Sequence, residues 1–452
     1  MPRSRIVPFV PLLAAGLASC YAAAPLDEAA LLREIRQTPA GATVAARPAA
    51  QAPSAPLTEA DAIARADAGN PFLRAERARV PEAAAEVRKA RRLENPEVRV
   101  SNGWEEDGAY SEDRFTLDFR WSPDPLPQHL AEIDIAKAAV PESRAEAALR
   151  AWEIRKEVRL AWTRAAWGRL RAAVDEERAA VRRETRDRLA GAPGSDPVER
   201  LRAEVAAADA EDRARRRLED EQEALRELAR LLGLPSADGL SVLPPDDPAA
   251  CPSPPADPAA RIEVAARSHP RVALARAAYG VSEAELKLEY ARRAPWARFI
   301  QIGWGYLPRV DDGIRNDRNR LRIGAALDLP ILDWNQGGVA AGEARRNRRA
   351  LQFREALTDV VGGVDSSMRR WTAAAERLDR LRAGAPATAQ RTVTLTREAV
   401  QAGRLSSLDL ARSRLDALDL REALVEAALS CREAAIEAEA ALGTPIEGDG
   451  TN

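Results

Sequence analysis

The most constraining feature of this 452-residue sequence is a pair of short alternating segments that lie between residues with helical patterns. In the second segment Phe115, Leu117, Phe119 and Trp121 alternate with polar residues such as Asp118. Successive side chains of a β-strand point to opposite faces, so the alternation predicts a ribbon with one apolar and one polar side. An isolated hairpin is only marginally stable in water. The ribbon therefore needs further strands or a surrounding medium other than water.

The same order of elements occurs twice. In the first half Asn70-Pro71 separates a short helix from a longer one, and a β-hairpin expected at 97–122 precedes a long helical hairpin at 128–232. In the second half His269-Pro270 takes the place of Asn70-Pro71, with strands expected at 297–330 and helices at 336–442. A repeat of roughly 200 residues is far longer than a solenoid repeat, so we expect a duplicated half-protein. The repeats are assigned to 57–235 and 259–445, with a proline-rich connector at 236–258 and a tail at 446–452.

Each half contains one helix of roughly 60–65 residues, which corresponds to about 90–100 Å. Helices of this length need partners, and the last helix has a heptad seam of small and apolar residues. The seam consists of Leu424, Ala428, Cys431, Ala435, Ala438 and Leu442. A kink is expected near Gly384-Ala385-Pro386, because proline removes a helix hydrogen bond. Trp152, Trp162, Trp167 and Trp371 are interpreted as packing between helices.

The composition argues against a nucleic-acid-binding protein and against a protein with transmembrane helices. A net charge of −2 with 31% charged residues gives no basic face for nucleic acid. Beyond the N-terminus the sequence has no run of about 18 apolar residues, so no transmembrane helix is expected. The four alternating segments are long enough to cross hydrocarbon as tilted strands, but an open sheet edge cannot lie in lipid. Closing such a sheet requires several copies of the chain. The alternative is a small amphipathic sheet that packs on the helices in water.

The N-terminus has the pattern of a secretory signal: Arg3 and Arg5 precede an apolar run that ends in Leu17-Ala18-Ser19-Cys20. The last four residues resemble the bacterial lipobox, in which the cysteine becomes the lipidated first residue. By this resemblance, residues 1–19 are a lipoprotein signal peptide, Cys20 carries the lipid anchor, and Tyr21 permits sorting to the outer membrane. Residues 20–56 are then a flexible, Ala- and Pro-rich tether. Ordinary cleavage after Ala24 is the alternative.

Residues for catalysis or metal binding do not cluster in the sequence. His129 and His269 are the only histidines and occupy unrelated positions in the repeats, so neither a metal site, a cofactor nor a His-based triad is expected. The chain is therefore not expected to be an enzyme. Cys251 in the connector and Cys431 in the heptad seam are expected to be small buried thiols, with a disulfide between them as an open alternative.

The duplicated layout, with its helix, Asn-Pro-Glu-Val strand, second strand and long helical hairpin, resembles the TolC-like outer-membrane efflux channel family. The stretch 329–338, LPILDWNQGG, is similar to that family's strand-to-helix signature, and 401–410, QAGRLSSLDL, resembles its helix-tip signature. The resemblance implies a homotrimer with a twelve-stranded transmembrane β-barrel and an α-helical periplasmic tunnel of coiled-coil helices. It implies a lipid-anchored protein in the outer membrane that receives cargo from a periplasmic adaptor and an inner-membrane pump. A periplasmic structural or adaptor-like coiled-coil lipoprotein is the alternative, although that class normally carries one helical hairpin.

The resemblance also assigns candidate functional residues. Asp409, with Glu199 as its first-half counterpart, would ring the periplasmic entrance, whereas the simpler interpretation is an acid placed favourably near a helix N-terminus. Adaptor docking is expected at the helix tips, which contain Gly403, Arg404, Leu405, Gly191 and Gly194. The polar faces of the strands would line a water-filled lumen through Arg120, Asp118, Arg322 and Asp328.

Overall fold

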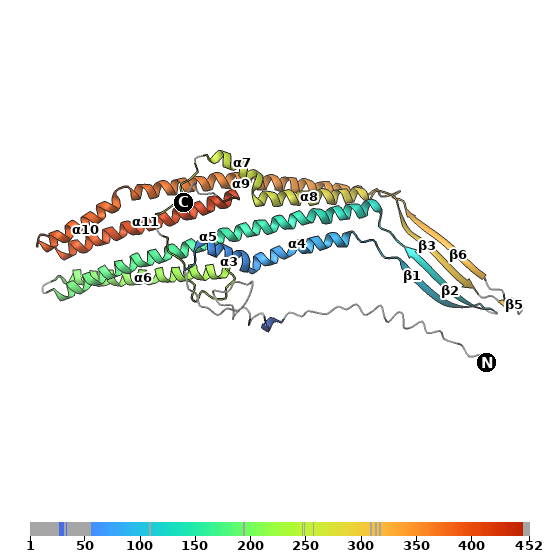
Figure 1. Cartoon of the computed structure of the whole chain (residues 1–452), viewed down its shortest axis with the longest axis horizontal. Coiled ribbons are helices and arrows are strands. Elements are labelled where there is room, and N and C mark those ends of the chain that lie inside the picture. The colour runs from blue at the N-terminus through green and yellow to red at the C-terminus, as the bar shows by residue number, and fades with distance from the viewer. Residues whose placement is uncertain are drawn as a thin grey trace.

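The computed structural model describes residues 27–30, 33, 56–107, 110–192, 195–245, 247, 249–255, 257–307, 310–311, 314–315 and 318–445. Within these residues the chain is an elongated rod of helices that carries a four-stranded antiparallel sheet at one end (Figure 1). The predicted class, mainly α with a small β part, is therefore confirmed for the single chain. The expected lipid-anchor residue Cys20 and the tip residue Gly194 lie outside the described residues.

Each half of the chain supplies two short helices, a β-hairpin and a long helical hairpin, in the same order. The first half contains α3 (Glu59–Gly69), α4 (Pro71–Ala90), β1 (Glu97–Asp107), β2 (Tyr110–Trp121), α5 (Leu126–Gly191) and α6 (Pro197–Leu231). The second contains α7 (Pro258–Ser268), α8 (Pro270–Ala291), β3 (Trp296–Leu307), β4 (Val310–Asp311), β5 (Ile314–Arg315), β6 (Arg318–Asp328), α9 (Gln336–Arg382), α10 (Ala385–Gln401) and α11 (Ser407–Leu442). Among the described helices, none is both long and apolar enough to cross a membrane.

The two halves differ in the continuity of their long helix. α5 runs through 66 residues, about 100 Å, without a break. The corresponding stretch of the second half is divided, because α9 ends at Arg382 and Gly384 has a φ of +82° before α10 begins with Pro386 in its first turn. Glycine adopts this left-handed backbone readily, and proline is tolerated in a first turn because no helical amide bond is needed there. The kink predicted at Gly384–Pro386 is confirmed, and it amounts to a full helix break.

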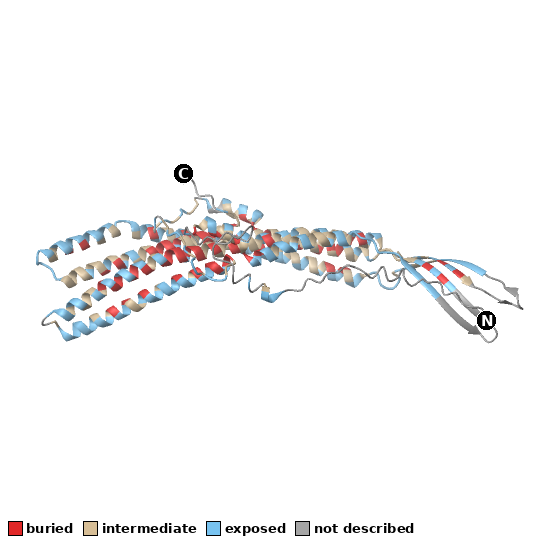
Figure 2. Cartoon of the chain, turned by 60° about the horizontal axis from the view of Figure 1, so that its bottom comes forward, coloured by how far each residue is buried: buried red, intermediate tan, exposed pale blue. Residues whose placement is uncertain are grey.

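Tryptophans pack between the helices in the middle of the rod, where Figure 2 shows most of the buried residues. Trp162, Trp167 and Trp371 are buried, and Trp152 is partly buried. The indole N–H groups of Trp152, Trp162 and Trp371 donate to the carbonyls of Ala440, Leu57 and Pro252, at 2.8–3.1 Å. Each indole thus ties a helix to another segment of the chain. The predicted packing role of these tryptophans is confirmed.

The first half closes through a contact between a helix N-cap and a helix end, which we call the clasp. Asn70 precedes α4, and its Oδ1 accepts from the Leu73 amide at 3.0 Å. Its Nδ2 donates to the carbonyl of Leu231, the last residue of α6, at 2.7 Å. Gly233 follows α6 with a φ of +75°, and a Cβ there would lie 2.7 Å from the Gly69 carbonyl oxygen. The glycine is therefore required both by its backbone and by the close approach.

The second half repeats the clasp with histidine in place of asparagine. His269 Nδ1 accepts from the Arg271 amide at 3.0 Å, and Nε2 lies 3.2 Å from the carbonyl of Ala440 near the end of α11. Gly443 follows α11 with a φ of +70°, and a Cβ there would lie 2.7 Å from the His269 ring. The neutral imidazole with its proton on Nε2 satisfies both contacts. The repeats therefore share a tertiary contact as well as an order of elements.

The expectation of two free thiols is wrong, because Cys251 and Cys431 form a disulfide with a Cα–Cα distance of 6.0 Å. The bond attaches the connector between the repeats to α11. Two further contacts hold the same connector against α9: the Trp371 indole donates to the Pro252 carbonyl, and Arg382 pairs with Asp247 at 2.8 Å. The two cysteines are 180 residues apart, so only the folded chain brings them together.

His269→Asn should remove a pH-dependent part of the stability. Burial lowers the pKa of His269, and a protonated Nδ1 cannot accept the Arg271 amide. The contribution is therefore complete above the pKa of unfolded histidine, about 6.5, and is lost as the pH falls through the lower folded value. Asparagine keeps both clasp hydrogen bonds without titrating. Thermal unfolding of the purified protein between pH 5 and 8 tests this.

The reciprocal variant Asn70→His is the matched control, since it should introduce a second acid-sensitive clasp and increase the loss of melting temperature at low pH. Equal pH profiles for wild type and His269→Asn would contradict the role of the imidazole.

Candidate functional site

The four long strands form one sheet in the order β1-β2-β3-β6. The hairpins of the two halves join along β2 and β3, where Phe119 faces Ile302 and Leu117 faces Trp304. β1 and β6 are the edge strands, and among the described residues no further strand pairs with either of them. Because facing residues share a side of an antiparallel sheet, each cross-strand row belongs to one face.

Apolar rows cover one face of the sheet, and this face is exposed. One row consists of Val98, Phe119, Ile302 and Ile323, and the next of Val100, Leu117, Trp304 and Leu321. These eight side chains are 40–76% exposed. Soluble monomers rarely expose contiguous apolar patches larger than a few hundred Å², and larger ones mark contacts with proteins or membranes. The sheet therefore has an apolar face that the single chain leaves uncovered.

The four residues expected to line a lumen lie together on the opposite face of the sheet: Asp118, Arg120, Arg322 and Asp328. Asp118 is only 8% exposed, and its carboxylate lies over Gly303, where a Cβ would overlap it. Arg322 Nη2 lies 3.9 Å from Asp118 Oδ1, and the Arg120 guanidinium lies 4.1 Å from the centroid of the Phe299 ring. Asp328 is exposed at the helix-proximal end of β6. On this face Asp118 is buried and Arg120 partly buried, whereas Arg322 and Asp328 are exposed. The unusual feature of the sheet is the opposite face, whose apolar side chains a sheet in water would normally pack on a core.

The LPILDWNQGG stretch forms the turn from β6 into α9. Asn335 has a φ of +54°, and its Nδ2 donates to the carbonyl and to the carboxylate of Glu289 near the end of α8, at 2.9 and 2.8 Å. A Cβ at Gly338 would overlap both the Asn335 side chain and the Glu289 carboxylate. The asparagine and the glycine are therefore needed to hold the start of α9 against the end of α8, beside the sheet.

At the far end of the rod, Asp409 caps helix α11. The amide and hydroxyl of Ser406 donate to Asp409 Oδ2 at 3.0 and 2.7 Å, and Ser406 Oγ accepts from the Asp409 amide at 3.2 Å. This reciprocal capping box satisfies amides that the first turn of a helix leaves free. The Ser406 hydrogen bonds, with the Arg412 guanidinium 3.6 Å away, lower the pKa of Asp409. Any role of this carboxylate in an entrance ring is additional to the cap.

The other predicted tip residues are exposed at the ends of the two helical hairpins. Gly403 follows α10 with a φ of +70°, and Arg404 and Leu405 lead into α11. In the first half Gly191 is the last residue of α5, and Glu199 lies in the first turn of α6. The structure thus places these residues at one end of the rod, opposite the sheet (Figure 1).

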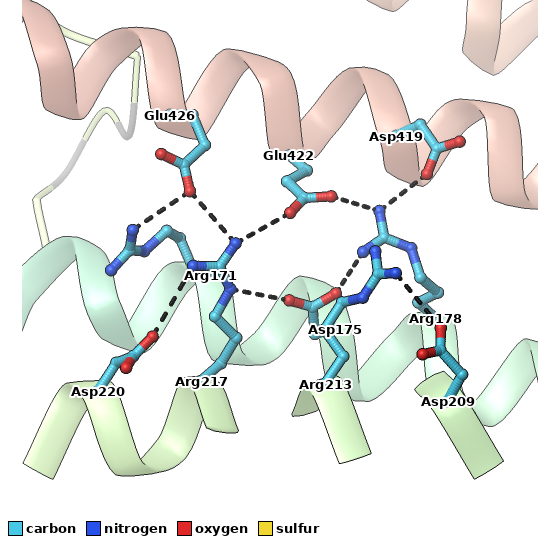
Figure 3. Close-up of polar contacts among 10 residues, drawn as sticks. All are labelled: Arg171, Asp175, Arg178, Asp209, Arg213, Arg217, Asp220, Asp419, Glu422 and Glu426. Atoms are coloured by element: carbon cyan, nitrogen blue, oxygen red, sulfur yellow. Dashed lines mark hydrogen bonds and ion pairs between the residues drawn. The ribbon is translucent and has the colours of Figure 1, made fainter. Parts of the chain in front are cut away.

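A group of charged side chains, which we call the charged lattice, joins α5, α6 and α11 (Figure 3). Its members are Arg171, Asp175, Arg178, Arg217, Asp419, Glu422 and Glu426. Arg178 pairs with Asp175 on its own helix and with Asp419 and Glu422 of α11, at 2.8 and 2.6 Å for the latter two. Arg217 of α6 contacts Asp175 and Glu422, each at 3.2 Å.

The central side chains of the charged lattice are buried, so each charge is stabilised by its oppositely charged partners instead of by water. Asp175 is 1% exposed and Arg178 is 5% exposed. Burial opposes ionisation of Glu422, but Arg178 and Arg217 outweigh it and lower the pKa of Glu422. Sequence patterns did not reveal this group, because Arg178 and Glu422 are 244 residues apart. A run of helical Arg and Glu residues looks the same whether it is solvated or paired across a seam.

Among the residues that the structure describes, no three His, Cys, Asp or Glu side chains lie close enough together to hold a metal ion.

Comparison with known proteins gives a likeness of structure only. No family model matches the sequence, and no curated protein matches it. The solved outer membrane protein VceC of Vibrio cholerae is 17% identical, covers 85% of this chain and 96% of its own, and has a TM-score of 0.65. The MtrE outer membrane channel of Neisseria gonorrhoeae, solved in its open state, is 16% identical with 85% and 89% covered and a TM-score of 0.67. The outer-membrane channel OprN is similar at 16% identity, 86% and 90% coverage and a TM-score of 0.67.

The chain therefore has the fold of the TolC-like outer-membrane channels, and the resemblance drawn from its sequence is confirmed at the level of the fold.

Arg178→Met should destabilise the helical rod by about 3–5 kcal/mol, because it leaves the buried Asp175 carboxylate with too little compensating charge. Arg213→Met is the matched control on α6, since Arg213 makes an exposed pair with Asp209 at 3.3 Å and its loss should cost less than about 1 kcal/mol. Denaturant unfolding followed by circular dichroism measures both. Equal losses for the two variants would show that the charged lattice does not hold the helices together.

Proposed function

We propose that three copies of this chain form an export channel in the outer membrane, a passive duct from the periplasm to the exterior. The observation that carries the proposal is the uncovered apolar face of the sheet, with exposed apolar rows on this face and charged side chains on the other. In a barrel wall the apolar face contacts lipid and the charged face lines water. The likeness of fold to outer-membrane channels supports the same assignment.

The edges of the sheet support an assembly of several copies. An unpaired edge leaves backbone amides and carbonyls without partners, which is unfavourable in lipid. Pairing β6 of one copy with β1 of the next satisfies both edges, and three copies of the four-stranded sheet give a twelve-stranded barrel. The long strands contain 11 or 12 residues, against the roughly 9–11 that a tilted strand needs to cross hydrocarbon.

The helices then extend the barrel into the periplasm as a tunnel. In this proposal an inner-membrane pump supplies the cargo, and a periplasmic adaptor docks at the exposed tips, with Gly403, Arg404 and Leu405 in one hairpin and Gly191 in the other. Carboxylates of Asp409 and Glu199 from three copies would converge at the entrance, where they would concentrate cations and form hydrogen bonds to neighbouring copies that hold the constriction closed. The chain itself performs no chemical step in this role.

The cysteines support a location outside the cytoplasm. The bond between Cys251 and Cys431 belongs in an oxidising compartment such as the periplasm. Cys20 is the remaining one of the three cysteines, which suits the proposed lipid anchor because it needs no thiol partner.

Ile302→Arg should block assembly of the barrel, whereas Gln301→Arg should not. The two residues are neighbours on β3, but Ile302 belongs to the apolar face and Gln301 to the polar face. An arginine on a lipid-facing strand position costs about 2–4 kcal/mol near the bilayer centre. We expect Ile302→Arg to lose the heat-modifiable trimer from outer-membrane fractions and its conductance in planar bilayers. Gln301→Arg should keep the trimer.

Equal insertion of the two variants would contradict the assignment of the faces. A wild-type chain that fractionates as a periplasmic monomer would contradict the proposed function as a whole.

Asp409→Ala should raise single-channel conductance if its carboxylate constricts the entrance, but the same change also removes a helix cap. Ser406→Ala separates the two effects, because it removes the cap hydroxyl and leaves the carboxylate in place. Loss of a cap costs about 0.5–2 kcal/mol. We expect higher conductance for Asp409→Ala and unchanged conductance for Ser406→Ala in planar bilayers. Equal increases would assign the effect to the cap, and no change in either variant would remove Asp409 from the gate.

A further inference from the structure

The edge strand β6 (Figure 1) carries three arginines in a row. Arg318, Arg320 and Arg322 occupy alternate positions, so their side chains are on one face of the sheet, about 7 Å apart. This is the polar face, opposite the exposed apolar rows. Gly303 and Gly305 of β3 face Arg322 and Arg320, and they have no side chain that could cover them. All three arginines are accordingly exposed.

The charges of this arginine row are largely uncompensated. Arg322 Nη2 lies 3.9 Å from Asp118 Oδ1, which is too far for a hydrogen bond, and that Asp118 oxygen is buried without a hydrogen-bond partner. In the described part of the chain, neither Arg318 nor Arg320 forms an ion pair. Three guanidinium groups therefore share one carboxylate.

The rest of the polar face does not offset this excess of positive charge. Arg99 pairs with Glu97 on its own strand at 3.0 Å, and the Arg120 guanidinium lies over the Phe299 ring. Among the side chains that the structure describes on this face, five arginines accompany three carboxylates: Arg99, Arg120, Arg318, Arg320 and Arg322 with Glu97, Asp118 and Asp328. The net positive charge is concentrated on β6.

An arginine row of this kind recognises one class of ligand. A guanidinium group offers two parallel N–H donors, which fit the oxygens of a carboxylate, phosphate or sulfonate group. With side chains about 7 Å apart, one small molecule with several acidic groups can contact two of them. In the proposed barrel, three copies place three such rows around one water-filled lumen, where walls of low dielectric strengthen the field.

We propose that Arg318, Arg320 and Arg322 form an anion-binding site in the lumen, which retains solutes that carry two or more carboxylate, phosphate or sulfonate groups. The inference rests on the proposed channel, since it assigns the wall of that channel a preference among solutes. The site lies at the opposite end of the rod from Asp409 and Glu199, whose charge has the other sign. The two ends of the duct therefore differ in the sign of the solute that they attract.

Single-channel recording in planar bilayers, with citrate as the probe, tests the site. Citrate added at constant ionic strength should reduce the current of the wild-type channel in a concentration-dependent way, whereas glycerol at the same concentrations should not. Arg320→Gln removes the central arginine and should raise the half-blocking concentration about tenfold, because a hydrogen bond between charged groups contributes a factor of this size. Arg320→Lys keeps the charge without the paired donors and should give an intermediate value.

Arg298→Gln is the matched control. It makes the same change of charge on β3, where Arg298 is also exposed but lies at the bulge, about 20 Å from Gly305, the residue that faces Arg320. Its half-blocking concentration should equal that of the wild type.

The conductance without citrate separates this inference from the proposed function. A conducting channel that citrate does not block, or that it blocks equally with and without Arg320→Gln, would overturn the anion site and leave the channel standing. An equal loss of block in Arg298→Gln would assign the effect to overall charge and would also overturn the site. A wild-type chain that forms no conducting trimer would overturn the site together with the channel.

Discussion

The unpaired edges of the four-stranded sheet are the constraint on which the rest of the structure depends. Backbone amides and carbonyls along β1 and β6 need partners, and the apolar rows need a medium other than water. A single chain can satisfy neither need, because its strands are already joined in the order β1-β2-β3-β6. In the proposed channel, repeating the sheet around an axis satisfies both at once, and it places Asp118 and Arg322 on the side that faces water. The proposed assembly therefore rests on the sheet rather than on the helices.

Two kinds of contact hold the helices of the rod together. Alanines and tryptophans allow close packing in the middle, where the clasps at Asn70 and His269 close each half in the same way. Further toward the tips the charged lattice around Asp175 and Arg178 lies beside smaller buried apolar clusters of the same helices. Buried ion pairs contribute little net stability compared with apolar contacts, but they tolerate few alternative alignments. We therefore regard the charged lattice as fixing how the two helical hairpins align.

The tips combine structural and functional demands in the same residues. Asp409 is bound to Ser406 in a capping box, so the helix start and any entrance ring share one carboxylate. Gly403 ends α10 with a backbone that glycine adopts readily, and it thereby exposes Arg404 and Leu405. Asp409 and Gly403 suit a helix tip both structurally and functionally. Their presence in the sequence therefore does not show which of the two roles they have.

The periodic features could be predicted from the amino-acid sequence: the two-residue alternation of the strands, the duplication, the length of the helices and the break at Gly384. These depend on local backbone geometry, which neighbouring residues set. Which residues meet depends on how the whole chain packs. The tertiary structure paired Cys251 with Cys431, gave Asn335 its partner Glu289 and assembled the charged lattice from three helices. The contacts of this kind between different elements join residues 42 to 244 positions apart, so their formation depends on how whole helices pack and leaves no periodic signal in the chain.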